Sequence, residues 1–255
     1  MLRPRITPCL LVHKGGLVKT VGFSTPKYVG DPINAVKIFN EKEADELVVL
    51  DIDATVNGSE PDYDMIRNLA NESRMPLCYG GGVKTAEQAS RIVSLGVEKV
   101  AVSSAAVEDP SLISEVAAQI GRQSVVVVID THKKSFGRGY EVYTHNGTRG
   151  AKKEPITFAK EVAQLGAGEI IFNSIDNDGQ MAGYDLSLAA KLRDSVDIPI
   201  TILGGAGSLD HMAALFEACG IVGASAGSFF VFKGPYKAVL ITYPSQQQKA
   251  SLINV

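Results

Sequence analysis

The sequence predicts an α/β fold, a (β/α)8 barrel of the TIM type with an internal twofold half-barrel repeat. Eight short apolar runs alternate with amphipathic segments along 255 residues, and parts of the second half repeat the first. Parallel strands joined by right-handed crossovers close into a barrel at this length more naturally than they form an open sheet. The whole chain, residues 1–255, is therefore expected to be one barrel domain.

The predicted strands are rich in Val, Ile and Leu. Each is too apolar for a strand with one face in water, which is typical of parallel strands that are covered on both faces. The eight runs are 5–11, 46–52, 75–80, 98–104, 124–130, 169–175, 198–204 and 221–227.

Between the strands, apolar residues recur at helical spacing. These segments begin with Asp, Ser, Thr or Pro and several end with Gly, which are the usual helix start and stop signals. The clearest predicted helices are 31–44, 85–96, 109–121, 155–166, 185–196 and 208–220.

The half-barrel repeat is visible in two pairs of segments. ELVVLDIDATVNG, from residue 46, recurs as EIIFNSIDNDGQMAG from residue 169, and PLCYGGGV from residue 76 recurs as PITILGGAG from residue 199. Internal duplication explains both matches. It implies two equivalent ligand-anchoring regions across the mouth of the barrel.

Composition excludes several classes of function. The net charge is −3, which gives no support for a nucleic-acid surface, although a small anionic ligand remains possible. Cys9, Cys78 and Cys219 lie far apart in apolar surroundings and are read as reduced core residues, and no metal or redox cofactor is expected. With no signal peptide and no apolar run that approaches a membrane span, we expect no membrane association and a cytoplasmic protein.

Two connections are longer than the others, and long loops in compact domains are usually functional. Residues 13–30 combine Lys14, Lys19 and Lys27 with glycines, which fits either a mobile cover over an anionic ligand or a solvated basic loop. Residues 131–153 contain an alternating pattern around Asn146-Gly147, which predicts a hairpin with a type I′ turn that decorates the rim.

In this fold, chemistry takes place where the strands end. Glycines at two symmetry-related strand ends, each opposite a strand that ends in small hydroxyl side chains, predict two phosphate sites for one bisphosphorylated ligand. The alternative for any single pair is a tight turn between strand and helix. The predicted phosphate residues are Gly81, Gly82, Ser103 and Ser104 at one site and Gly204, Gly205, Gly227 and Ser228 at the other.

Carboxylates at the same ends are candidates for general acid/base catalysis. The candidates are Asp51, Asp53, Asp130, Asp176 and Asp178. Asp130 ends the run VVVVI, where desolvation should raise its pKa and suit it to proton transfer, whereas Asp178 lies before a Gly and fits either a catalytic residue or a turn. Where the repeat carries Asp130, the first half carries Leu11. The histidines His13, His132, His145 and His211 share no pattern and are read as structural.

Four strands begin with a charged residue at the opposite end of the barrel. Arg5, Glu46, Lys99 and Glu169 alternate in sign and are expected to form a ring. Two interpretations remain open, a salt-bridged plug or a gated entrance for a small neutral molecule.

These residues resemble, over essentially the whole chain, the HisF family, the cyclase subunit of imidazole glycerol phosphate synthase. The resemblance is carried by motifs such as CLLVHKGGLVK, YGGGVKT, VVVVID, SIDNDG and GGAG in the family's order. It implies that Arg5, Glu46, Lys99 and Glu169 form an ammonia gate against a HisH-type glutaminase, in a heterodimer. It also implies that Lys19, Asp130 and Asp178 act on a phosphorylated ribulosyl-formimino ribonucleotide, and that an acidic contact with the glutaminase falls at Glu98.

The chain departs from the family where the strand-1 aspartate falls at Leu11, which neither donates nor accepts a proton. The family's strand-4 hydroxyl and amide pair is here Ser103 and Ser104, and its strand-6 threonine is Asn173. Such changes resemble HisF-like paralogues of surface-polysaccharide systems, which share the ending SFFVFKGPYKAVLITYP and are thought to work with a sugar amidotransferase. The leading hypothesis is ammonia supply to that enzyme. The alternatives are a genuine cyclase subunit of histidine biosynthesis and a non-catalytic scaffold that activates the glutaminase.

Overall fold

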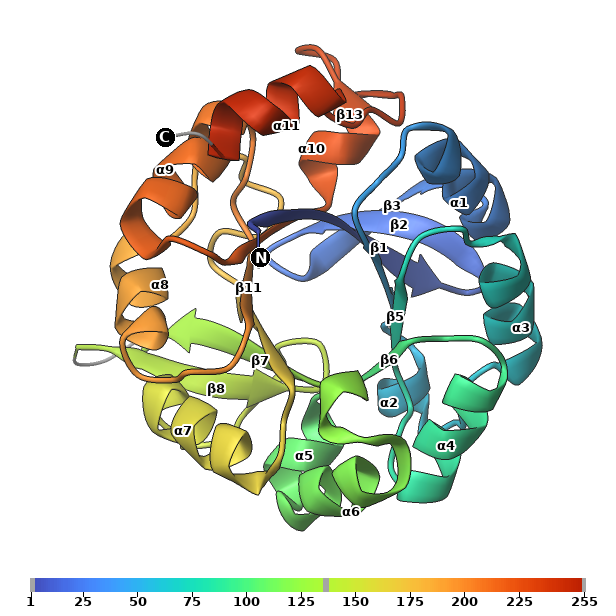
Figure 1. Ribbon diagram of the computed structural model, residues 1–255, viewed down its shortest axis with the longest axis vertical. Helices are drawn as coiled ribbons and strands as arrows, with labels where there is room; N and C mark the ends of the chain where they lie inside the picture. The colour runs from blue at the N-terminus through green and yellow to red at the C-terminus, as the bar shows by residue number, and fades with distance from the viewer. Residues whose placement is uncertain (1–2, 135–137, 254–255) are drawn as a thin grey trace.

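The computed structural model describes residues 3–134 and 138–253 and contains a closed barrel of parallel strands surrounded by helices (Figure 1). Neighbouring barrel strands follow the order β10-β11-β12-β1-β4-β5-β6-β7, and pairing of β10 with β7 closes the ring. The barrel strands are β1 (Arg5–His13), β4 (Leu47–Asp51), β5 (Leu77–Gly80), β6 (Lys99–Val102), β7 (Val125–Lys133), β10 (Glu169–Ser174), β11 (Ile200–Leu203) and β12 (Gly223–Ala226). The predicted fold class and all eight predicted strands are confirmed.

Helices cover the outside of the barrel, and each of the six predicted helices is present (Figure 1). The principal helices are α1 (Pro32–Glu41), α3 (Tyr63–Glu72), α4 (Ala86–Ser94), α6 (Ser111–Ile120), α7 (Pro155–Leu165), α8 (Leu186–Arg193) and α9 (Leu209–Cys219). The expected start signals act as caps: the Asp31 side chain accepts the Asn34 N–H at 2.8 Å, and Thr85 and Gln88 form a capping box on α4. The shorter helices are α2 (Ala54–Asn57), α5 (Ser104–Glu108), the 3₁₀ helix η1 (Arg122–Ser124), α10 (Ser228–Val231) and α11 (Gln246–Ile253).

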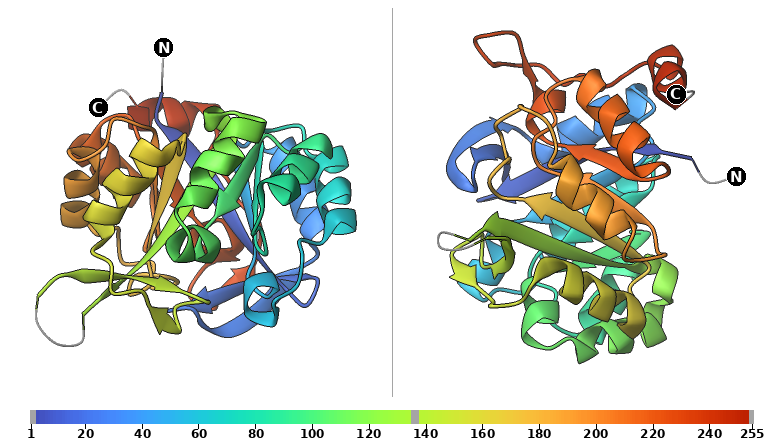
Figure 2. Two further views of the ribbon diagram at one scale, coloured as in Figure 1. Left: turned by 90° about the horizontal axis from the view of Figure 1, so that it is seen from below. Right: turned by 90° about the vertical axis from the view of Figure 1, so that its left-hand side faces the viewer.

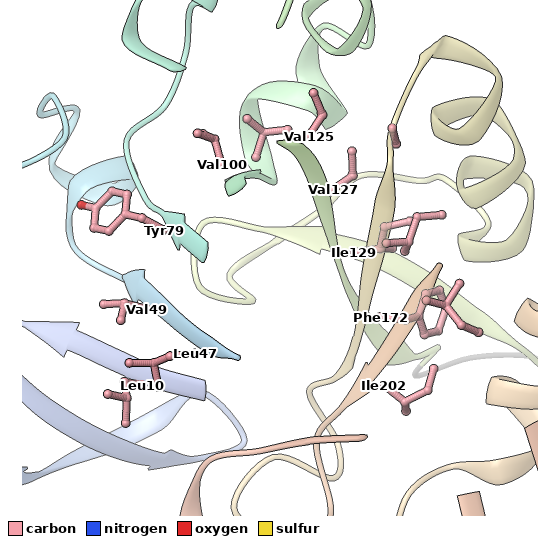
Figure 3. Packing of buried hydrophobic residues seen from close by; sticks show 14 of the residues in the cluster. Leu10, Leu47, Val49, Tyr79, Val100, Val125, Val127, Ile129, Phe172 and Ile202 are labelled. Atoms are coloured by element: carbon pink, nitrogen blue, oxygen red, sulfur yellow. The ribbon is translucent and has the colours of Figure 1, made fainter. Parts of the chain in front are cut away.

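Side chains alternate between two apolar regions along each barrel strand. Outward-facing residues such as Leu47, Val127 and Phe172 pack against the helices and form the larger region (Figure 3). Inward-facing residues fill the barrel itself, namely Cys9, Val48, Cys78, Ala101, Val126, Val128, Ile171 and Leu203, with Leu11 and Leu50 at the upper edge. A barrel with this filling is a packed core, so even a small molecule could pass along it only if these side chains moved.

Three antiparallel hairpins lie at the face where the barrel strands end, on the side of the molecule opposite both termini (Figure 2). They are β2 (Gly16–Val21) with β3 (Ser24–Gly30), β8 (Tyr140–Thr144) with β9 (Arg149–Gly150), and β13 (Phe232–Lys233) with β14 (Ala238–Val239). Residues 13–30, expected as a loop, are therefore largely a continuation of β1 into β2 and β3. The predicted turn is present, because Asn146 and Gly147 both have positive φ and the Thr148 N–H donates to the His145 carbonyl.

Candidate functional site

One large pocket opens at the carboxyl ends of the barrel strands. Its empty volume, which is continuous with solvent at the mouth, is about 1120 Å³, enough for a ligand of nucleotide size. Its floor is the upper edge of the inner apolar region, at Cys9, Leu11 and Leu50. The polar groups that line it include Lys19, Asp51, Ser103, Ser104, Asp130, Asn173, Asp178 and Ser228. The structure thus brings the predicted catalytic residues and most of the predicted phosphate residues into one cavity.

Asp130 lies near the upper end of β7 and faces this pocket. Burial raises its pKa to about 6, against a hydrogen bond at 2.9 Å from the Asn173 amide to Asp130 Oδ1, which favours the ionised form. The other amide atom, Asn173 Oδ1, is buried without a hydrogen-bond partner among the described residues. Leu11, on β1, lines the same pocket with an apolar side chain. At the two positions related by the repeat, the pocket therefore holds one carboxylate, Asp130, and one apolar side chain, Leu11.

The β2–β3 hairpin carries Lys19 into the pocket. Its Nζ is buried and donates to the Cys9 carbonyl at 2.5 Å, and burial lowers the pKa of the ammonium despite the nearby charge of Asp178. Lys19 Nζ lies close to Gly227, where an added Cβ would be only 2.6 Å away. Lys19 is thus neither a mobile nor a solvated residue in this structure, and its charge faces the turn that begins α10.

Asp178 lies across from Lys19, after β10. Its carboxylate accepts the Thr20 hydroxyl at 2.6 Å and the Phe23 N–H at 3.3 Å, so it anchors the β2–β3 hairpin. Burial nevertheless raises its pKa, which keeps a proton-transfer role open. Asp178 fixes a turn, which is one of the two interpretations that the sequence allowed, and it also lines the pocket, so its catalytic role stays a prediction.

The two predicted phosphate regions lie in adjoining cavities. Gly81, Gly82, Ser103 and Ser104 line the large pocket, whereas Gly204 and Gly205 line a neighbouring pocket of about 250 Å³, and Gly227 and Ser228 line both. Glycine is required at Gly81 and Gly205 by backbone geometry, because each has positive φ and an added Cβ would collide with a carbonyl oxygen. Those contacts explain the glycines as tight turns. Helices α5 and α10 have only five and four residues, so a helix dipole would contribute little to binding an anion. Hydrogen bonds from the N–H groups of their first turns would contribute more.

The β8–β9 hairpin was predicted as rim decoration, and this was wrong. Its tip folds over the pocket, where Asn146 Nδ2 donates to the Ile52 carbonyl at 2.7 Å and the His145 N–H donates to Ser104 Oγ at 3.3 Å. Both His145 and Asn146 line the cavity. The Asn-Gly turn signal located the hairpin in the sequence, but nothing in the sequence indicated which way it leans.

Two of the histidines do share a pattern, contrary to expectation. His13 Nδ1 makes a hydrogen bond with Asp53 Oδ1 at 2.7 Å, and His132 Nδ1 lies 2.8 Å from Asp176 Oδ1 without hydrogen-bond geometry. In the first half the Lys14 N–H donates to Asp53 at 2.7 Å, and in the second half the Lys133 N–H donates to Asp176 at 2.9 Å. These twin contacts reflect the half-barrel repeat. They show Asp53 and Asp176 fastening strand ends, so we do not assign them to catalysis.

The four charged residues at the other end of the barrel form a closed ring. Arg5 donates to Glu46 at 3.0 Å and to Glu169 at 2.7 Å. Lys99 Nζ contacts the same two carboxylates at 2.5 Å and 2.8 Å. Thr201 adds a hydrogen bond to Glu169 at 2.6 Å, which the sequence did not predict.

Burial distinguishes the anions of this ring from its cations. The Glu46 and Glu169 side chains are almost completely buried, whereas Arg5 and Lys99 are 30% and 18% exposed. Burial alone would raise the pKa of Glu169, but the charges of Arg5 and Lys99 outweigh it and hold that pKa below its usual range. The same attraction raises the pKa of Lys99 although burial opposes it. The pKa shifts of Glu169 and Lys99 favour their charged forms, whereas burial and the neighbouring Glu169 raise the pKa of Glu46 despite its contacts with Lys99 and Arg5.

Comparison with known proteins fits this arrangement of a pocket at one end and a charged ring at the other. Residues 5–236 match the model of a family described as histidine biosynthesis protein. The "putative imidazole glycerol phosphate synthase subunit HisF" of Leptospira borgpetersenii is 58% identical over 252 residues, which are 99% of both chains. The chain belongs to the HisF family.

Other HisF proteins extend the similarity across the whole chain. One from Vibrio vulnificus, named as a putative HisF subunit with a number, is 55% identical over 255 residues, 100% of this chain and 98% of its own. The imidazole glycerol phosphate synthase subunit HisF of Streptomyces coelicolor is 42% identical over 217 residues, 85% of this chain and 86% of its own. At the family level, the chain is a HisF-like, cyclase-type subunit of imidazole glycerol phosphate synthase.

Within residues 3–134 and 138–253, no group of three or more His, Cys, Asp or Glu side chains is arranged to hold a metal ion. No helix in the same part of the chain is both long and apolar enough to cross a bilayer.

The raised pKa of Asp130 predicts a pH-dependent stability. Because its pKa is about 6 in the folded chain and about 3.8 in an unfolded one, the folded chain binds the proton more tightly, and the free energy of unfolding falls as pH rises through this interval. We expect Asp130→Asn to be more stable than the wild type at about pH 7.5, by up to about 3 kcal/mol, and equally stable near pH 4. Urea unfolding of both proteins across this range measures the difference. A difference in the free energy of unfolding that does not change with pH would contradict the raised pKa of Asp130. Asp64→Asn, on the exposed surface of α3, is the control.

Proposed function

We propose that this HisF-family chain is the barrel subunit of a glutamine amidotransferase complex. It receives ammonia from a HisH-type glutaminase docked at the charged ring and delivers it, through the barrel, to a sugar amidotransferase of surface-polysaccharide biosynthesis. One observation carries the proposal. The chain has the complete ring of Arg5, Glu46, Lys99 and Glu169, but its pocket has Leu11 at the position that corresponds to Asp130 in the repeat.

The ring has the composition of a gate. Its two carboxylates are fixed and buried, but each cation is partly exposed and bound only through side-chain contacts. Lys99 is a point charge on a flexible stem, so it can swing outward with less loss of geometry than the planar guanidinium of Arg5. Nearby, Glu98 accepts the Leu77 N–H at 2.7 Å through one carboxylate oxygen, which leaves the other oxygen for a docked partner.

The barrel interior favours neutral ammonia over ammonium. Its filling is almost entirely apolar between the ring and the pocket, so a charged species would lose its hydration without compensation. Thr7, Thr201 and Ser225 give one side of the interior buried hydroxyl groups, and Thr7 Oγ1 has no hydrogen-bond partner within the described residues. A small neutral hydrogen-bonding molecule matches these surroundings.

The pocket supports delivery better than cyclisation. General acid/base chemistry on one substrate generally uses a donor and an acceptor, and the position of the second group is occupied by Leu11.

A genuine, slower cyclase is the second candidate. Asp130 and Asp178 both have raised pKa values and line the same pocket as Lys19, so this candidate uses Asp130 together with water or with Asp178. A scaffold that only activates the glutaminase is the third candidate, and the experiment below separates it from a conduit.

Reconstitution with the glutaminase and the sugar amidotransferase tests the proposal. With glutamine as the nitrogen source, we expect sugar amidation to require this chain and to resist a trap that consumes free ammonia, glutamate dehydrogenase with 2-oxoglutarate and NADPH. Amidation that proceeds from glutamine equally well without the chain would refute ammonia supply.

A substitution in the ring separates a conduit from a scaffold. Lys99→Met leaves Glu46 and Glu169 as like charges that share only Arg5, so we expect the product formed per glutamine hydrolysed to fall several-fold while the glutaminase still binds. Lys160→Met, on the exposed surface of α7, is the control and should retain wild-type coupling. Unchanged coupling in Lys99→Met, with intact docking, would favour the scaffold.

A further inference from the structure

Residues 228–253 connect the pocket end of the barrel with the end that carries the charged ring. The segment begins at Ser228, which lines the pocket, passes through α10 and the β13–β14 hairpin, and ends in α11. Figure 2 shows this last helix, in red beside the C-terminus, on the same side of the molecule as the N-terminus and away from the hairpins. The contacts that the segment makes on this side lie next to the ring.

The pairing of β1 with β4 begins above the ring. The first paired residues are Cys9 and Val48, and the same register continued toward the ring places Ile6 opposite Asp45. Ile6 directly follows the ring residue Arg5, and Asp45 directly precedes the ring residue Glu46. Whatever joins Ile6 to Asp45 therefore also sets the distance between two charges of the ring.

The hydroxyl group of Tyr243 is one such joint. It accepts the Asp45 N–H at 3.0 Å and donates to the Ile6 carbonyl at 2.8 Å. Burial raises the pKa of Tyr243, so the hydroxyl keeps the proton that it donates. The aromatic ring packs against Phe39 and Phe230, with ring centroids 6.5 Å and 5.6 Å apart. Tyr243 is thus a fixed spacer between the start of β1 and the residue before β4.

Lys249 of α11 holds Asp45 from another direction. The Asp45 carboxylate accepts the Ile6 N–H at 3.1 Å through Oδ2 and the Lys249 ammonium at 2.6 Å through Oδ1. Lys249 Nζ also donates to the Glu43 carbonyl at 3.3 Å and lies 5.2 Å from the centre of the Tyr243 ring. The Lys249 side chain is only 7% exposed, and these contacts compensate for its burial.

The ring depends on this spacing, because Arg5 must reach two carboxylates at once. It contacts Glu46 at 3.0 Å and Glu169 at 2.7 Å, so a shift of β1 relative to Glu46 would lengthen one of the two contacts. We propose that Tyr243 and Lys249 are positioning residues of the ring, which set the spacing between Arg5 and Glu46 and thereby the passage of ammonia. The role in ammonia passage rests on the proposed function, whereas the role in ring geometry does not.

A double-mutant cycle in urea unfolding tests the role in ring geometry. Glu46→Gln removes one charge of the ring, so we expect it to destabilise the wild type more than it destabilises the Tyr243→Phe background. The two effects on the unfolding equilibrium constant should differ at least about fivefold, because substitutions within one network are not additive. Equal effects in both backgrounds would refute the role of Tyr243.

Tyr184→Phe is the matched control for this cycle. Its hydroxyl is also buried and donates to a barrel strand, at the Ser225 carbonyl of β12, but that strand carries no residue of the ring. Glu46→Gln should therefore destabilise the Tyr184→Phe background as much as the wild type. A departure from additivity as large as that of Tyr243→Phe would mean that any lost tyrosine hydroxyl weakens the ring, which would overturn the proposal.

Lys249→Met is a second, independent variant. Methionine keeps an apolar stem against Tyr243 but removes the ammonium that binds Asp45, so Glu46→Gln should again have an effect at least about fivefold smaller than in the wild type. Lys249→Arg, which keeps a positive charge for Asp45, should restore most of the wild-type effect. Full additivity of Lys249→Met with Glu46→Gln would reduce Lys249 to an anchor of α11 and refute its positioning role.

The role in ammonia passage is tested in the complex with the glutaminase and the sugar amidotransferase. We expect the product formed per glutamine hydrolysed to fall at least about threefold in Tyr243→Phe and to stay at the wild-type level in Tyr184→Phe. An unchanged ratio in Tyr243→Phe would refute this role. If the wild type itself forms no product from glutamine, ammonia supply is refuted, and the unfolding cycles alone decide whether Tyr243 and Lys249 position the ring.

Discussion

Supplied with a saturating ammonium salt and the ribulosyl-formimino ribonucleotide of the HisF reaction, the wild-type chain is expected to turn over no faster than its Asp130→Asn variant. The ammonium salt bypasses the glutaminase, so the measurement reports only the chemistry of the pocket. Loss of one general acid/base group costs about 10²- to 10⁴-fold in rate, and Leu11 removes one. Steady-state turnover well above the Asp130→Asn blank would identify a working cyclase and refute ammonia supply as the main function.

Leu11→Asp is the complementary variant. It returns a carboxylate to the pocket that already contains Asp130, Asp178 and Lys19, so we expect turnover to rise about 10²-fold over the wild type. Leu11→Asn is the matched control, because Asn has the shape of Asp but carries no charge. Its turnover should equal that of the Asp130→Asn blank. If Leu11→Asp gains nothing, the pocket differs from a cyclase by more than this residue, and Asn173 and Ser103 are the next positions to change.

Glu169→Ala is expected to have the largest effect on stability. Glu169 binds Arg5, Lys99 and Thr201 in buried surroundings, and its removal leaves two cations with Glu46 as their only carboxylate in the ring. Breaking a buried ion pair by deleting one partner typically costs 3–5 kcal/mol, so we expect a loss of about 3–5 kcal/mol in the free energy of unfolding. Urea denaturation at neutral pH measures it.

Asp64→Ala provides a control with the same bond length. Asp64 and Arg67 are also 2.7 Å apart, but both side chains are largely exposed on α3. An exposed pair contributes at most about 1 kcal/mol, because water screens the charges. Equal losses for Glu169→Ala and Asp64→Ala would mean that the ring contributes no more than a surface pair, which would exclude the plug interpretation.

Much of the barrel was predictable because the signals that specify it are local. The run VVVVID predicts a strand covered on both faces, and β7 is that strand. Thr85 and Gln88 predict the start of α4 through a cap that needs only four consecutive residues. Asp130 was expected to have a raised pKa from its apolar neighbours in sequence, and its pKa is indeed raised by burial.

Other features of the site were not predictable because they depend on residues that are distant in sequence. Nothing near Lys19 indicates that its ammonium is buried against the Cys9 carbonyl beside Gly227, because the β2–β3 hairpin must first fold back over the strand ends. The direction of the β8–β9 hairpin is set by the contact of Asn146 with Ile52, ninety-four residues away. The pairing of His13 with Asp53 likewise needs β1 and β4 to be neighbours.

The sequence by itself determined the number and order of the strands, the positions of the four ring charges and the presence of Leu11 where the repeat carries Asp130. Periodicity, capping and a repeated pattern are encoded in neighbouring residues, so they can be recognised before any folding. Only the tertiary structure decided that Arg5, Glu46, Lys99 and Glu169 close into one ring with Thr201, and that Asn173 holds Asp130. Those contacts exist because β10 pairs with β7 and closes the barrel, which places side chains from distant strands within hydrogen-bond distance.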